Sequence, residues 1–177
     1  MARQHAGEHA DDLAQALCEL AWAFEAEGKL AEAENASRQA LTLREKLKPQ
    51  RDGLNLIDTL YEVTVILKEE QKLDEAELFA KRCQACCDRQ IPNDWRTFNC
   101  RSTLGCTLVA AQKYAEAEPL LLSAYGGLTE LKPAFFIDTK PRVEETVEGL
   151  VAVYDHLRMS DKAADWKLKL DALEGTR

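Results

Sequence analysis

Helix-breaking residues and histidine are scarce in this 177-residue sequence, and their scarcity limits the class of protein it can be. The chain has 8 Gly, 5 Pro and 3 His, against 46% hydrophobic and 31% charged residues. This is the composition of a helical protein, with disorder expected only at the ends. The chain can bury roughly two thirds of its unfolded surface, enough for one core or one short repeat array without disulfide staples.

Basic residues are also fewer than acidic residues. The chain carries 23 Lys and Arg against 31 Asp and Glu, a formal net charge of −8. Its field repels phosphate backbones and anionic lipids, so we expect neither nucleic acid nor membrane partners. No segment approaches the ~20 apolar residues of a membrane span, and the start, MARQHAGEHADDL, lacks the apolar core of a secretory signal. The expected location is cytoplasmic.

Catalytic motifs are missing as well. The sequence contains no G-x-G-x-x-G, G-x-x-x-x-G-K-[ST], H-E-x-x-H or G-x-S-x-G. We therefore predict a protein that is not an enzyme and needs no cofactor. His5 and His9 lie near acidic residues that could hold a divalent ion, but chain ends usually lack the order of a metal site, so a solvated terminus is the favoured interpretation. His156 stands alone and is expected at the surface.

Three segments repeat one another at intervals of about forty residues. They read GKLAEAENASRQAL, QKLDEAELFAKRCQ and QKYAEAEPLLLSAY, and a weaker fourth copy lies in YDHLRMSDKAADWKLKL. Each copy has an alanine at the same place, and these alanines are Ala33, Ala76, Ala117 and Ala163, at spacings of 43, 41 and 46 residues. We expect their methyl groups to be buried where neighbouring helices approach closely.

Further apolar positions recur around each alanine. Small or apolar residues follow it by seven positions, at Ala40, Cys83, Ala124 and Leu170, and large residues precede it by nine, at Phe24, Leu67, Leu108 and Tyr154. This spacing predicts a helix-turn-helix unit repeated four times, with no β-strand. The expected helices lie near residues 11–27, 30–47, 54–70, 73–89, 95–111, 114–130, 142–157 and 160–172. Gly28 ends the first helix, and Asn93 or Asp94 caps the fifth.

The residues that carry this pattern in the first repeat are Leu17, Leu20, Ala21, Phe24, Gly28, Ala33 and Ala40. They resemble the tetratricopeptide repeat (TPR). The long period and AEAEPLL are similar to the repeats of kinesin light chains and many bacterial proteins. The stretch from IPNDW to AYGGL further resembles the C-terminal repeats of bacterial multidomain serine/threonine kinases. HEAT repeats have a similar period, but the alanine spacing of seven and Leu104-Gly105 favour the TPR.

The resemblance implies an all-α fold, an α-α superhelix or TPR-type solenoid of four helical hairpins. We expect an N-terminal tail over residues 1–10 and a single domain over 11–173, with repeats near 11–50, 54–91, 94–131 and 142–173.

The family also implies a function and a binding groove. It implies a non-enzymatic scaffold that binds a peptide or partner protein in a concave groove lined by the first helix of each hairpin. The matching positions here are Glu19, Trp22, Glu25, Tyr61, Glu62, Val65, Lys68, Asn99 and Ser102. Carboxylates mixed with aromatics suggest an extended or helical ligand with basic and apolar side chains. Alternatively, Trp22 packs on the adjacent helix and the acids form a solvated face. The asparagine pairs that often clamp a peptide backbone in this family are replaced, in the second repeat by Tyr61-Glu62.

Two other functions remain open. The five cysteines between 83 and 106, spaced C-x2-C-C and C-x5-C, could form a zinc module. Cys83, however, occupies a small-residue position of the repeat, where reduced cysteine behaves as a small hydrophobe. The chain could also be a self-associating or structural segment of a larger bacterial signalling protein such as a serine/threonine kinase. The terminal helices of an open solenoid expose apolar faces unless they are capped, and the first helix, with Leu13, Leu17 and Leu20, is expected to expose such a face.

Overall fold

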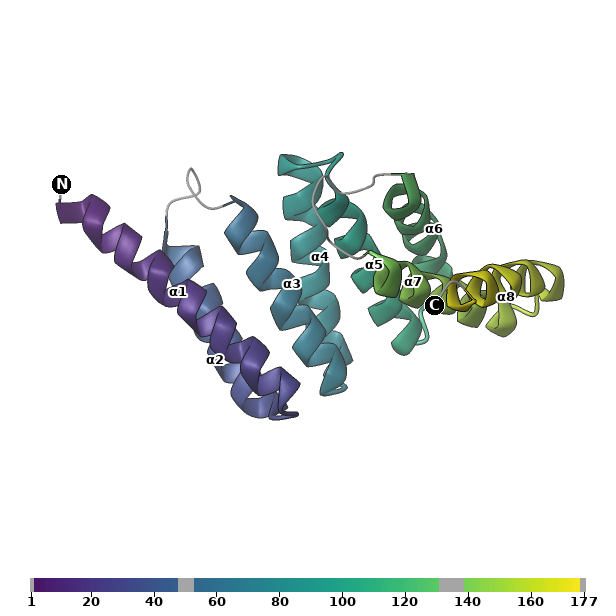
Figure 1. The fold of residues 1–177 in the computed structure, drawn as a ribbon, viewed down its shortest axis with the longest axis horizontal. Helices are drawn as coiled ribbons and strands as arrows, with labels where there is room; N and C mark the ends of the chain where they lie inside the picture. Colours follow the sequence, from purple (N-terminus) through teal and green to yellow (C-terminus); the bar gives the residue numbers. More distant parts are fainter. Residues whose placement is uncertain (1, 48–52, 131–138, 176–177) are drawn as a thin grey trace. The chain divides into compact units, whose positions relative to one another are not determined.

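The structure, a computed structural model, describes residues 2–47, 53–130 and 139–175. All regular structure in these ranges is α-helical (Figure 1). The helices are α1 (Ala2–Ala26), α2 (Leu30–Lys46), α3 (Gly53–Glu69), α4 (Leu73–Gln90), α5 (Trp95–Ala110), α6 (Tyr114–Glu130), α7 (Lys140–His156) and α8 (Ser160–Glu174). The ends of the first and third expected repeats, residues 48–50 and 131, lie outside the described ranges.

The helices confirm the positions predicted from the repeat, with one difference at the N-terminus. Helix α1 begins at Ala2, so residues 2–10 of the expected tail are helical. Contacts group the chain into two compact units, Met1–Cys86 and Cys87–Arg177. Helices α1, α2 and α3 pack together in the first unit, and α5, α6, α7 and α8 pack in the second. Helix α4 begins in the first unit and ends in the second. A single domain over 11–173 remains a prediction.

The turn inside each hairpin has the same backbone geometry. Its central residue lies in the left-handed region, with φ of 73° at Gly28, 61° at Gln71, 60° at Gln112 and 56° at Arg158. The next N–H donates to a carbonyl five residues back, as in Lys29 N to Phe24 O at 2.8 Å, and the other three turns repeat this bond. This is the Schellman ending of a helix, in which glycine usually holds the left-handed position.

The alanines that define the repeat are all buried, as predicted. Ala33, Ala76 and Ala117 have no exposed surface, and Ala163 is 2% exposed. In the first unit Ala33 packs with Ala21, Ala36 and Ile66, and Phe24 lies against this cluster. Small side chains therefore set the close approach of α1, α2 and α3.

In the second unit, glycines allow the helices to approach closely. A Cβ added at Gly127 on α6 would lie 2.1 Å from the Phe98 ring of α5. A Cβ at Gly105 would lie 2.7 Å from the side chain of Leu121. Helices α5 and α6 thus approach so closely that these positions have no room for a side chain.

Within the second unit, an aromatic contact joins the last helix to α6. Tyr125 of α6 meets Trp166 of α8 edge to face, with ring centroids 4.8 Å apart. No helix in the described part of the chain combines the length and the apolar character that a bilayer span requires.

Candidate functional site

Seven of the nine predicted binding residues lie in the first unit, on α1 and α3. They are Glu19, Trp22, Glu25, Tyr61, Glu62, Val65 and Lys68. Helices α1 and α3 contact each other directly. Trp22 and Glu25 of α1 and Glu69 of α3, with the buried Cys18 and Glu62 below them, are called here the α1–α3 face.

Electrostatic coupling shows that the two helices bring these side chains together. The pKa of Glu62 responds to the charge of Glu25, and the pKa of Glu25 is raised by burial and then by Glu69. Deeper between the helices, the Cys18 thiol lies 3.7 Å from the Thr59 hydroxyl. The α1–α3 face therefore collects carboxylates from both helices.

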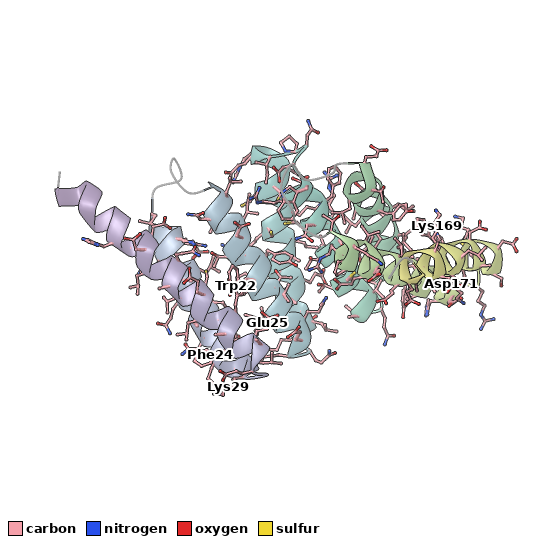
Figure 2. The ribbon with its side chains drawn as sticks, in the orientation of Figure 1. Trp22, Phe24, Glu25, Lys29, Lys169 and Asp171 are labelled. Carbon is pink, nitrogen blue, oxygen red and sulfur yellow. The ribbon has the colours of Figure 1, made fainter. Side chains whose placement is uncertain are left out.

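Trp22 is the large aromatic side chain of this face. It is 54% exposed, so the neighbouring helix does not bury it. Figure 2 shows Trp22 and Glu25 on the side of α1 that faces α3. An exposed indole beside carboxylates is a favourable anchor for a partner, because aromatic residues contribute heavily to binding energy at interfaces.

Glu62 is buried beneath this face and is only 4% exposed. Neither of its carboxylate oxygens has a hydrogen-bond partner of normal geometry among the described residues. Burial raises the pKa of Glu62 to about 7; the Cys18 thiol and Arg44 lower it, and the charges of Glu25 and Asp58 raise it further. Near neutral pH the carboxyl group is therefore divided between its neutral and ionised forms.

The Cys18 thiol beside it is not reactive. Burial, followed by the charge of Glu62, raises the pKa of Cys18 to about 11. The sulfur is therefore a protonated thiol at neutral pH and a poor nucleophile or metal ligand.

Arg44 of α2 lies in the same buried region and was not identified from the sequence. It is 3% exposed and donates from Nη1 to the Asn55 carbonyl at 2.6 Å and to the Thr59 hydroxyl, and from Nη2 to Gln15 Oε1 at 2.9 Å. Its Nε lies 3.6 Å from the carboxylate of Asp11. Arg44 thus links α1, α2 and α3. The available signal was its position four residues after Ala40, on the buried stripe of α2.

The other two predicted residues belong to the second unit. Ser102 is fully buried, and its hydroxyl lies 2.7 Å from that of Thr146, so it joins α5 to α7. Asn99 is partly buried and lines a cavity of about 240 Å³ with Trp95, Arg142 and other residues of this unit. In this conformation Asn99 is accessible to a ligand and Ser102 is not.

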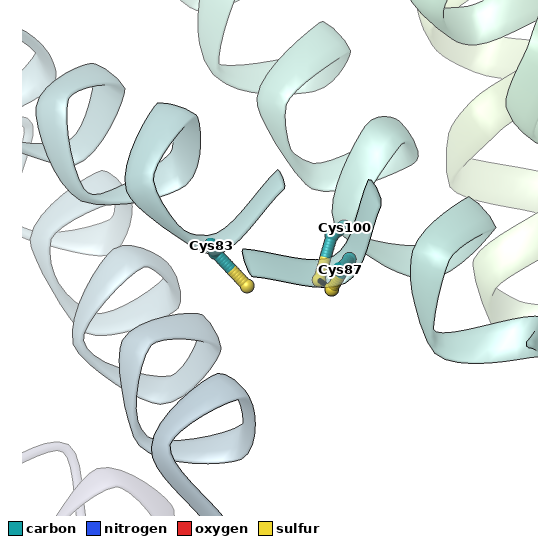
Figure 3. Close-up of side chains that lie close together, drawn as sticks. All are labelled: Cys83, Cys87 and Cys100. Atoms are coloured by element: carbon teal, nitrogen blue, oxygen red, sulfur yellow. Dashed lines mark hydrogen bonds between the residues drawn. The ribbon is translucent and has the colours of Figure 1, made fainter. Parts of the chain in front are cut away.

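Two of the cysteines lie in contact, and the described residues do not form a complete four-ligand zinc site. All six are free thiols, and the sulfurs of Cys87 on α4 and Cys100 on α5 lie 3.3 Å apart (Figure 3). Cys83 lies one turn before Cys87 on α4, and Cys106 donates instead to the Glu145 carbonyl at 3.7 Å. Structural zinc is almost always held by four ligands. Among the described residues no fourth Cys, His, Asp or Glu joins Cys83, Cys87 and Cys100.

Comparison with known proteins identifies the fold class. No protein-family model matches the sequence, and no curated protein matches it. Among solved structures the chain is similar to BtubC (BKLC) from P. vanneervenii, with a TM-score of 0.82 and 17% identity over 94% of this chain and 65% of that chain.

It is also similar to a putative kinesin light chain from Podosopora anserina with nearly identical TPR-like repeats, at a TM-score of 0.70 and 15% identity over 92% of this chain and 75% of that one. A variant of that protein gives a TM-score of 0.71. The fold is therefore that of a TPR-like helical repeat protein with kinesin-light-chain-like neighbours, which confirms the predicted all-α solenoid. The chain spans about two thirds of the length of BtubC.

Proposed function

We propose that this protein is a non-enzymatic scaffold that binds a peptide, or an extended segment of a partner protein, on the α1–α3 face. TPR-like folds typically mediate protein–protein interactions, and stacked helical hairpins provide extended surfaces for them. The observation that carries the proposal is the exposed indole of Trp22 one helical turn before Glu25, a carboxylate that interacts with Glu69 of α3. We place the protein in the cytoplasm.

The charge of the face selects the ligand. Glu25 lies one turn after Trp22 on α1, and it is close enough to Glu62 and Glu69 of α3 for their charges to act on one another. A ligand with apolar and basic side chains complements this surface, whereas nucleic acid and anionic lipid would be repelled. The net charge of −8 acts in the same direction.

The test is cross-linking and mass spectrometry of partners captured by the full chain. Trp22→Ala is expected to reduce capture of the principal partner by about tenfold, since truncating an aromatic anchor typically costs about 1 kcal/mol or more, and often about 2. Leu78→Ala is the matched control, because Leu78 is similarly exposed, at 58%, but lies on α4. Equal capture by the wild type and both variants would show that the α1–α3 face is not the binding surface.

A second candidate function is self-association through the outer side of the first hairpin. A groove of about 390 Å³ lies there between α1 and α2, lined by Leu13, Leu17, Leu43 and polar residues. Leu13 is 53% exposed and Leu17 is half-buried, whereas Leu60, the equivalent of Leu17 one repeat later, is buried. A second copy of the chain that covered this groove would give the first repeat the burial that the second already has.

Sedimentation velocity over a wide concentration range tests this candidate. The wild type is expected to form a dimer that Leu13→Glu abolishes, while Leu168→Glu, at an exposed leucine of α8, leaves it intact. A wild type that stays monomeric up to millimolar concentration would rule out self-association through this groove.

A further inference from the structure

The carboxyl group of Glu62 has no cationic hydrogen-bond partner in the free protein, and the Cys18 thiol is the neighbouring donor that acts on it. Both oxygens are buried and neither accepts a hydrogen bond of normal geometry from a described residue. A buried carboxylate is costly unless it is paired and hydrogen-bonded. The cation whose field reaches it, Arg44, donates its Nη groups to Asn55, Thr59 and Gln15 instead.

The other groups around Glu62 make the region more negative. Glu25 faces it from α1 and Asp58 from α3, and Arg44 of α2 is the cation that acts in the opposite sense. The Cys18 thiol, also from α1, is neutral at physiological pH. Glu25 is itself close enough to Glu69 to be affected by its charge. An incoming positive charge would therefore be attracted by several carboxylates at once.

We propose that Glu62 and Glu25 form a subsite for a lysine or arginine side chain of the bound polypeptide, with Trp22 lying against the aliphatic part of that side chain. This inference rests on the proposed function of the α1–α3 face. Trp22 is exposed and Glu25 is partly buried one turn later on α1. Rotation of these two side chains admits the basic group, and the carboxylate of Glu62 provides the charge-assisted hydrogen bond at its end.

Binding of the basic side chain also moves a proton. The ionised carboxylate pairs with the cation, so the bound state favours loss of the Glu62 proton. Because the pKa of Glu62 is about 7 in the free protein, ligand binding near pH 7 releases part of a proton to the solvent. A role for Glu62 in packing alone would not produce this release.

A displayed library of random peptides, selected against the full chain at pH 8, tests the proposal. The variants are Glu62→Gln, which removes the buried charge, and Glu32→Gln, which removes an exposed charge in the first turn of α2. The wild type and Glu32→Gln are expected to enrich peptides with a lysine or arginine at one fixed position, and Glu62→Gln to lose that enrichment. The best peptide should bind Glu62→Gln at least about tenfold more weakly than Glu32→Gln.

Calorimetry of that peptide in two buffers of different ionisation enthalpy gives the second measurement. Proton release at pH 7 is expected from the wild type and Glu32→Gln and not from Glu62→Gln. Peptides without a basic residue, or equal affinity and proton release in all three proteins, would overturn the cation subsite while leaving the binding face intact. If the wild type enriches no peptide at all, the proposed function itself fails and the subsite fails with it.

Discussion

Replacing Glu62 by glutamine is expected to change how stability depends on pH. In the folded protein the pKa of Glu62 is about 7, against an ordinary value of 4.5, because burial favours the neutral form. The folded state therefore holds this proton more tightly than the unfolded state does. The stabilisation is fully present below pH 4.5 and is lost as the pH rises through about 7.

The size of the loss follows from the change in pKa. Each tenfold change in proton affinity is worth about 1.4 kcal/mol, so the rise from 4.5 to about 7 corresponds to about 3 kcal/mol. Glutamine does not ionise and does not incur this loss. The free energy of unfolding of Glu62→Gln, relative to that of the wild type, should therefore increase by about 3 kcal/mol between pH 4.5 and pH 8.

Urea unfolding followed by circular dichroism at pH 4.5, 6, 7 and 8 measures this difference. Glu32→Gln is the control: it removes the same charge from an exposed position, so its difference from the wild type should stay within about 0.5 kcal/mol. A difference between Glu62→Gln and the wild type that does not change with pH, or that falls as the pH rises, would refute the assignment of Glu62 as a buried, uncompensated carboxyl group.

Four further predictions concern helix packing, a hairpin turn, the buried Arg44 and the cysteines. Gly127→Ala should lower the free energy of unfolding by about 1–3 kcal/mol in a urea titration, because its Cβ would overlap the Phe98 ring, whereas Gly126→Ala, with nothing within 4 Å, should not be destabilising. Gln112→Gly should raise the thermal midpoint, since relief of a left-handed non-glycine residue is worth about 1 kcal/mol. Arg44→Met removes a buried cation from a hydrogen-bonded network and should lower the free energy of unfolding by about 3 kcal/mol in a urea titration. A chelator should leave the thermal midpoint unchanged, because the described residues supply no fourth zinc ligand; a midpoint that falls with chelator would instead support the zinc module.

The repeat pattern was sufficient to predict the helices and their pairing. Ala33 and its three equivalents recur where helices must approach closely, and small residues can satisfy that requirement almost alone. The start of the first helix was missed by nine residues. The sequence from Ala2 to Ala10, ARQHAGEHA, contains no large apolar residue, so periodicity gave no reason to extend the helix through it.

The buried charges could not be predicted in the same way. Glu62 and Arg44 are buried, whereas charged residues on helices are usually exposed. Their burial depends on where α1 crosses α3 and on which backbone carbonyls remain for Arg44, and these are tertiary properties. Ser102 shows the same limit, since its hydroxyl is buried only because Thr146 of α7 lies opposite.

The four hairpin turns share one backbone geometry but not one amino acid at the left-handed position. One turn in four uses glycine for its left-handed residue, while glutamine or arginine adopts that backbone in the others. The flanking helices therefore impose the reversal of the chain, and the amino-acid type at the left-handed position can vary. A signature that demands glycine there would detect the first hairpin and pass over its three structural copies.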